Sequence, residues 1–342
     1  MVPGIASPRP RHRPRHRLRL AFALVVLAPL VGEFLLGNQP VTALPAVLML
    51  APMYGCGALL IREAARRAGG GWPTMLLLAA AYALLEEGPI DQMLWNPHYG
   101  GVDMGLAYAG TQVSWLGTSA AMVQDVLSMH TVWSICVPIA LIETFSADRT
   151  RPWLGGPGLA VTGVVFVAGS VFLAQAQYQS GRFMGSTAQF AGVSAAIVVL
   201  LAGAFAVVRR PLPPRDAATP APWIVGTAAF AAGSLYWAHD TLLPDGASPW
   251  APVALWFVLA GGIAWLCARW SRTHGWGPDH RLALTAGALL TYVWLGFTHA
   301  REMDVPYGTA LLGNVLFGAA ALVLLGVAAM RLRRRVPPAE GG

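Results

Sequence analysis

The chain has 342 residues, of which 56% are hydrophobic and only 11% are charged. About a quarter of the residues in an ordinary soluble domain are charged, so this composition excludes a soluble protein and predicts a membrane protein. The formal charge of +7 rests on 23 basic residues, all of them arginine.

Apolar runs near the ~20 residues that cross a hydrocarbon core follow one another along almost the whole chain. The alternating pattern of a membrane β-barrel is absent, so the spans are predicted to be helical. We predict an all-α polytopic transmembrane bundle, with a basic tail at 1–18, a membrane domain of about ten helices at 19–330 and a second basic tail at 331–342. The ten spans are expected at 20–37, 41–61, 73–95, 119–142, 154–176, 187–208, 223–239, 251–268, 282–299 and 308–330.

The arginines give the orientation. If the N-terminus is cytoplasmic, every arginine except Arg182 and Arg301 falls in a cytoplasmic segment, which agrees with the positive-inside rule. Both termini are therefore predicted to be cytoplasmic, and the positive charge is attributed to topology and to membrane lipid, with no nucleic acid as a partner. The absence of lysine, with 38 glycines and 26 prolines, is typical of GC-rich bacterial genomes and favours the bacterial inner membrane, that is, the cell membrane.

Prolines lie inside the first four spans, at Pro29, Pro45, Pro52, Pro89 and Pro138, and are almost absent from the interiors of the others. An internal proline frees a backbone carbonyl, which is tolerated in lipid only where protein or water can satisfy it. We expect the first four helices to form the walls of a polar cavity. The alternative is that the prolines only bend the helices for packing.

The stretch AAYALLEEGPIDQMLW, residues 80–95, carries Glu86, Glu87 and Asp91 within an apolar span. Each ionised carboxylate costs roughly 2.5–3.5 kcal/mol at the centre of a membrane helix, so such residues usually face a bundle interior and carry function. Glu87 and Asp91 share one helical face, where two negative charges repel unless a proton or a cation is shared. His130 lies in the next span and adds an acid/base group or an imidazole ligand. We predict that Glu86, Glu87 and His130 are catalytic, with a divalent metal left open as the cofactor.

Other polar residues lie in the outer halves or outer ends of the spans. The connection 96–118 is predicted to cap this region. The binding candidates are Glu33, Asp91, Gln92, Asn96, His98, Asp125, His299 and Glu302. Two further predictions concern packing and surface: Glu143 and Asp148 are expected to be surface charges, and Gly55, Gly57, Gly261 and Gly262 are expected at close helix contacts.

The motif ALLEEGPIDQML resembles the EExxxR motif of the CAAX protease and bacteriocin-processing family of intramembrane proteases. By this resemblance Glu86 and Glu87 match the paired glutamates, and His130 matches the histidine of the FxxxH motif in a following helix. The resemblance implies an intramembrane peptidase in which a glutamate activates water and His130 helps to hold the water or the oxyanion. It covers about fifty residues.

This sequence also departs from the family pattern. Asp91 stands in place of the arginine, and Val126 in place of the phenylalanine. Leu243 and Met303 stand four residues after His239 and His299, where the family has Asn or Asp.

Three classes of function remain open from the sequence. The first is hydrolysis of a membrane-borne peptide or small molecule by Glu86, Glu87 and His130. The second is a transporter or proton-coupled carrier, in which the same acids titrate as a relay. The third is a non-catalytic membrane scaffold, in which the carboxylates pair structurally with Arg182 or Arg301.

Overall fold

The computed structural model describes residues 14–334, except residues 102, 210–212, 245 and 303–305. Most of the two predicted tails, 1–18 and 331–342, therefore lies outside the described residues. The described parts of these tails are helical except for Arg334, because helix α1 begins at Pro14 and helix α14 ends at Arg333.

Seven helical segments among the described residues are long and apolar enough to cross a membrane. They are Arg15–Leu35, Ala120–Thr144, Gly156–Gly181, Thr187–Ala206, Trp250–Trp270, Pro278–Ala300 and Tyr307–Arg333. An eighth is counted if Val41–Leu50 and Tyr54–Arg67, which meet at a bend of 47°, form one broken span. The chain is thus an all-α, multi-pass membrane protein.

Helices also occupy the two remaining predicted spans, but they are short. Helix α4 (Trp72–Leu85) has 14 residues and α10 (Pro222–Trp237) has 16. Both are below the ~20 residues that an untilted helix needs to cross a bilayer. The number of ten spans therefore stays a prediction.

The remaining elements, in chain order, include several short helical segments of 3-10 or π type, labelled η. They are α1 (Pro14–Pro29), η1 (Leu30–Leu35), η2 (Val41–Ala46), α2 (Val47–Leu50), α3 (Tyr54–Arg67), η3 (Glu86–Ile90), η4 (Tyr99–Gly101), α5 (Met104–Tyr108), η5 (Ala109–Thr111), β1 (Gln112–Val113), β2 (Thr118–Ser119), α6 (Ala120–Ser128), η6 (Met129–Cys136), α7 (Val137–Thr144), α8 (Gly156–Gly181), α9 (Thr187–Ala206), η7 (Val207–Arg209), α11 (His239–Leu242), α12 (Trp250–Trp270), α13 (Pro278–Glu302) and α14 (Tyr307–Arg333).

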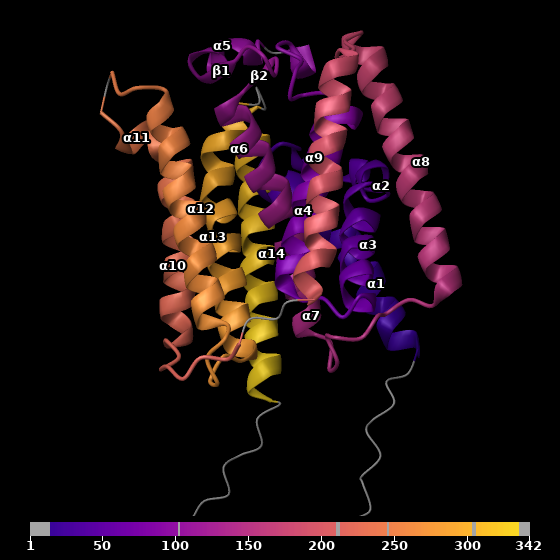
Figure 1. Ribbon diagram of the computed structural model, residues 1–342, viewed down its shortest axis with the longest axis vertical. Helices are drawn as coiled ribbons and strands as arrows, with labels where there is room; N and C mark the ends of the chain where they lie inside the picture. Colours follow the sequence, from indigo (N-terminus) through magenta and orange to yellow (C-terminus); the bar gives the residue numbers. More distant parts are fainter. Residues whose placement is uncertain (1–13, 102, 210–212, 245, 303–305, 335–342) are drawn as a thin grey trace, which may run out of the picture.

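The long helices run roughly parallel to one another in a single bundle (Figure 1). Helices α10, α12 and α13 lie on one side, α8 lies on the opposite side, and α1, α3, α4 and α7 lie between them. Helix α1 begins and α14 ends at the same end of the bundle, the lower end in Figure 1. Helix α5 and the antiparallel pair β1–β2, which belong to the connection 96–118, lie across the upper end.

Glycines allow the closest helix contact. A Cβ atom on Gly55 would lie 2.1 Å from the carbonyl oxygen of Val25, and a Cβ atom on Gly57 would lie 2.6 Å from a tyrosine ring. These two predicted contacts are confirmed. The prediction for Gly261 and Gly262 is wrong, because a Cβ atom on either meets nothing within 4 Å. Helix α12 turns this face outward, away from the rest of the bundle.

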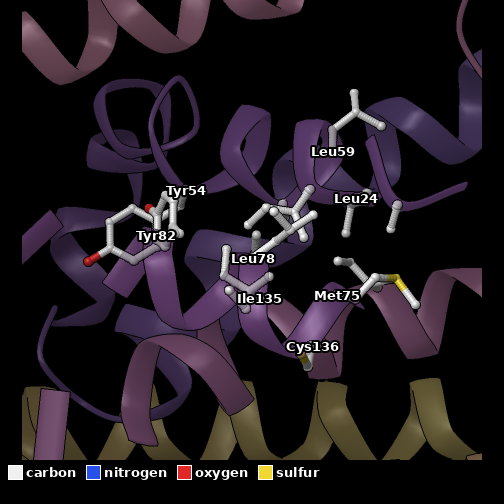
Figure 2. Packing of buried hydrophobic residues seen from close by; sticks show 14 of the residues in the cluster. Leu24, Tyr54, Leu59, Met75, Leu78, Tyr82, Ile135 and Cys136 are labelled. Carbon is white, nitrogen blue, oxygen red and sulfur yellow. The ribbon is translucent and has the colours of Figure 1, made fainter. Parts of the chain in front are cut away.

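An apolar cluster fills the centre of the bundle between α1, α3, α4 and η6. Figure 2 shows Leu24, Met75, Leu78 and Ile135 packed together, with Tyr54 at one edge of the cluster. Each of the four aliphatic side chains is at most 6% exposed. Polar residues lie at both ends of α4 and at both ends of the α6–α7 segment. The apolar cluster therefore separates two regions of polar side chains, which are called the upper and the lower polar region after their positions in Figure 1.

The lower polar region is a buried ionic network, and it corrects the prediction for Glu143. That residue is 4% exposed, and its carboxylate accepts hydrogen bonds from Nε and Nη2 of Arg66 at 3.0 and 2.7 Å. Arg62 Nε lies 3.1 Å from the same carboxylate, while Arg62 Nη2 donates to the carbonyls of Arg149 and Arg151. The loop after α7 folds back over these charges, so Glu143 is not a surface residue.

Candidate functional site

The upper polar region is built on π-helical segments. Glu33 lies in η1, Glu86 and Glu87 lie in η3, and His130 lies in η6, and all three segments are π-helical. Pro89 lies within η3 and provides no N–H, and the N–H of Asp91 bonds to the carbonyl of Glu86, five residues back. Single π turns within α-helices are rare and occur often at functional sites.

The three predicted catalytic residues meet in space. His130 Nε2 lies 2.6 Å from Glu87 Oε1, and His130 Nδ1 lies 2.9 Å from Glu86 Oε2. The hydroxyl of Ser134 lies 3.3 Å from the same Nδ1. Glu86, Glu87 and His130 are at most 5% exposed. The imidazole thus lies between two adjacent buried carboxylates.

The proton inventory of this cluster follows from its contacts. A neutral imidazole donates from one ring nitrogen only, whereas both nitrogens of His130 face a carboxylate. Either the imidazole carries both protons, or one glutamate is a carboxylic acid and donates to the ring. In both cases one proton is shared between groups that can exchange it, as general acid–base chemistry requires.

The same residues form a candidate metal site. One ligand atom from each of Glu86, Glu87 and His130 can be chosen so that all three lie within 4.8 Å of one another. Glu87 Oε2 is buried and has no hydrogen-bond partner among the described residues. Carboxylate oxygens and imidazole nitrogens are both ligands of Zn²⁺, and catalytic zinc sites use three protein ligands and keep a fourth position for water. A cation would have to replace the direct contacts of His130 with the glutamates.

A second set of polar contacts extends the cluster towards α13. The ring of Tyr54 lies 5.9 Å from the ring of His130, and its hydroxyl donates to Glu33 at 2.6 Å. Asn38 donates to the other oxygen of Glu33 and lies 2.6 Å, through its Oδ1, from His299 Nε2. Two binding candidates, Glu33 and His299, are therefore joined in one network that borders the His130 cluster.

Asp91 connects the cluster to a cavity of about 310 Å³. The cavity is also lined by Gln92, Asn96 and His98, so four of the binding candidates surround it. Tyr99 donates to Asp91 at 3.1 Å and accepts from Gln177 of α8 at 2.6 Å. Because Asp91 lies one helical turn after Glu87, this cavity reaches the neighbourhood of the catalytic candidates.

Within the cavity, the candidates have different roles. Gln92 is only 5% exposed, has φ +60° and accepts a hydrogen bond from the N–H of Gly185, so it joins η3 to the start of α9. Asn96 accepts from the N–H of His98, whose side chain is 71% exposed. The contact of Gln92 with Gly185 is therefore structural, whereas the side chain of His98 is accessible from the cavity.

The other binding candidates lie elsewhere. Asp125 accepts hydrogen bonds from Tyr108 and Tyr236, between α6 and α10, and makes no recorded contact with the glutamates. Glu302 ends α13, and its side chain lies outside the described part of the chain. Arg182, one proposed partner of the carboxylates, is exposed and packs over the ring of Tyr178 at 5.7 Å, so that pairing is wrong.

Sequence reasoning missed the tyrosines and amides that hold the acids in place. Tyr54, Tyr99 and Gln177 lie in or beside apolar segments, where a tyrosine is more often read as packing. A hydroxyl at membrane depth needs a partner, and that requirement was the available signal for Tyr54. Nothing in the sequence indicates that Gln177 faces Tyr99, because they are 78 residues apart.

The sequence model of one family matches residues 22–336, which is most of the chain. The chain belongs to this uncharacterised membrane protein family. No curated protein and no solved structure matches the chain. The family membership agrees with the helical, membrane-spanning fold.

Proposed function

We propose that the protein is an intramembrane hydrolase that acts on a membrane-borne substrate, with Glu86, Glu87 and His130 as its catalytic residues. The observation that carries this proposal is the buried contact of one imidazole with two adjacent carboxylates, at 2.6 and 2.9 Å. Buried ionisable groups are costly in a bilayer and are usually retained for chemistry.

The proposal gives each residue of the cluster a role. Each glutamate has a carboxylate oxygen without a hydrogen-bond partner among the described residues, so each can accept a proton from water, and we assign this role to Glu87. His130 then passes the proton on or holds the developing charge, and Glu86 orients the imidazole through Nδ1. The resemblance of Glu86, Glu87 and His130 to the CAAX protease and bacteriocin-processing motifs supports a peptide bond as the bond that is hydrolysed.

One observation bears on a second histidine. Among the described residues neither His239 nor His299 joins the cluster: His239 pairs with Asp240 at 3.2 Å, and His299 contacts Asn38. The proposed chemistry therefore rests on one histidine and two glutamates.

A transporter or proton-coupled carrier is the alternative, and the packing counts against it. A carrier needs a polar route from the site to the lower end of the bundle. In the described chain this path is filled by Leu78, Ile135 and Ile139, each at most 6% exposed. The charged residue beyond them, Glu143, is held by Arg66.

Hydrolysis is tested with the full-length protein in vesicles that contain fluorescent transmembrane peptides, in water enriched in oxygen-18. We expect cleaved peptides whose new carboxylate carries one heavy oxygen, detected by mass spectrometry. The Glu87→Gln variant should lose this product by at least about 100-fold, because general acid–base groups contribute about that factor or more. The matched control is Asp148→Asn, which removes an exposed carboxylate from a loop.

Metal content of the purified protein is measured in parallel, with and without a chelator. A stoichiometric divalent metal that is lost in Glu86→Gln/Glu87→Gln supports the metal form of the site. Equal cleavage by Glu87→Gln and by the wild type contradicts the proposal. Proton flux across the vesicles without any cleavage favours the carrier instead.

We also propose that ten helices span the bacterial inner membrane with both termini in the cytoplasm. The distribution of arginine supports this orientation, and α1 begins at the same end of the bundle as α14 ends. In this arrangement the catalytic cluster lies in the outer half of the membrane.

A further inference from the structure

A second cavity lies at the lower end of the bundle, far from the glutamates. It has a volume of about 420 Å³ and is lined by Phe145, Val327, Met330, Arg331 and Arg334. Val327, Met330 and Arg331 lie in helix α14, and Arg334 directly follows its end. Phe145 directly follows the end of α7. The cavity thus combines two arginines with an apolar wall.

The first arginine is fixed in place but incompletely satisfied. Arg331 Nη2 donates to the carbonyl of Phe145 at 3.1 Å, and its guanidinium lies 5.7 Å from the ring of the same residue. Arg331 Nε is buried and has no hydrogen-bond partner among the described residues. A guanidinium held on one side with a free N–H donor is suited to an anionic oxygen.

The second arginine adds a charge at the mouth. Arg334 is exposed, follows the last turn of α14 and lies three residues after Arg331, on the same side of the helix. No ion pair is recorded for Arg331 or Arg334 within the described chain. The buried acids at this end, Glu63 and Glu143, already bind Arg62 and Arg66. Among the described residues, no ion pair therefore compensates the positive charge of the cavity.

The apolar wall points to the source of the anion. Val323, Val327 and Met330 are 65%, 42% and 53% exposed, and their spacing of four and three residues places them on one face of α14. This face belongs to a membrane-spanning helix, so the exposed side chains meet acyl chains. These exposed apolar side chains lie next to the two arginines along the helix, in the same order as the acyl chain and the phosphate of a phospholipid.

We propose that this cavity binds an anionic phospholipid, with the phosphate held by Arg331 and Arg334 and one acyl chain packed along Val323, Val327 and Met330. The site differs from general attraction between basic residues and a membrane, because it is a cavity with an oriented donor. Basic pockets between helices at the cytoplasmic side are known to suit phospholipid head groups.

The experiment measures lipid binding to the full-length protein in detergent by native mass spectrometry. Phosphatidylglycerol is compared with phosphatidylcholine of the same acyl chains and with inorganic phosphate. We expect Arg334→Gln to weaken phosphatidylglycerol binding about 5-fold, and Arg331→Gln/Arg334→Gln to weaken it about 30-fold, since each arginine near anionic lipid contributes roughly a factor of five.

The charge-matched control is Arg15→Gln/Arg333→Gln, which removes two exposed arginines from the same end of the bundle. It should retain binding within about 2-fold of the wild type. Unchanged affinity in Arg334→Gln overturns the proposal. The side chain of Arg334 makes no recorded contact with the described residues, so this variant is expected to fold. An equal loss in the control assigns binding to surface charge, and displacement of the lipid by inorganic phosphate assigns the site to free phosphate. Either outcome also overturns it.

Discussion

Removal of the buried carboxylate of Glu143 is expected to destabilise the protein strongly. Three guanidinium nitrogens lie within 3.1 Å of this carboxylate, from Arg62 and Arg66, and Glu143 is only 4% exposed. In Glu143→Gln both arginines lose their shared negative charge while they remain buried. Breaking a buried ion pair in this way costs about 3–5 kcal/mol, so we expect the free energy of unfolding to fall by that amount.

The assay is denaturant unfolding of the purified protein in a fixed detergent, followed by tryptophan fluorescence. The control is Asp148→Asn, because the Asp148–Arg151 pair is 38% and 59% exposed and should change stability by less than about 1 kcal/mol. The double variant Glu143→Met/Arg66→Met removes the charges of Glu143 and Arg66 together and should be less destabilised than Glu143→Gln. A loss below about 1 kcal/mol in Glu143→Gln, or additive losses in the double variant, would refute the reasoning.

Two further predictions concern packing and topology. Gly55→Ala should lower stability by about 1–3 kcal/mol, because its Cβ would lie 2.1 Å from the carbonyl oxygen of Val25; Gly261→Ala, which meets nothing within 4 Å, should change it by no more than about 0.5 kcal/mol in the same unfolding assay. A reporter that is active only in the cytoplasm should be active when fused after Arg334 and inactive when inserted at Gly101, and the reverse pattern would contradict the predicted orientation.

The helical membrane fold was predictable because hydropathy and the arginine pattern are properties of whole segments. The meeting of Glu86, Glu87 and His130 was also predictable in outline, since ionisable residues in neighbouring spans tend to face one another. The sequence could not assign the exposure of Glu143, because its burial depends on the following loop, which folds back so that the carbonyls of Arg149 and Arg151 face Arg62.

The sequence also could not show which glycines lie at helix contacts. Small residues permit close helix contact, but only a neighbouring helix makes the contact happen. Gly55 has the backbone of α1 beside it, whereas Gly261 faces outward. Two glycines with similar sequence surroundings thus have opposite roles, and the difference lies in the position of their helices within the bundle.

The π-helical segments also bear on how this site can vary among related chains. A π turn contains one residue more than an α turn, so it behaves as a single-residue insertion that the helix absorbs. Deleting one residue from η3 would therefore restore a regular α-helix and leave the segments on either side on their present faces, so the change would be confined to Glu86–Ile90. Glu86 and Glu87 both lie in this turn and contact His130 from it. Relatives with a one-residue gap at this point are therefore expected to keep the membrane fold without the contact of two adjacent carboxylates with one imidazole.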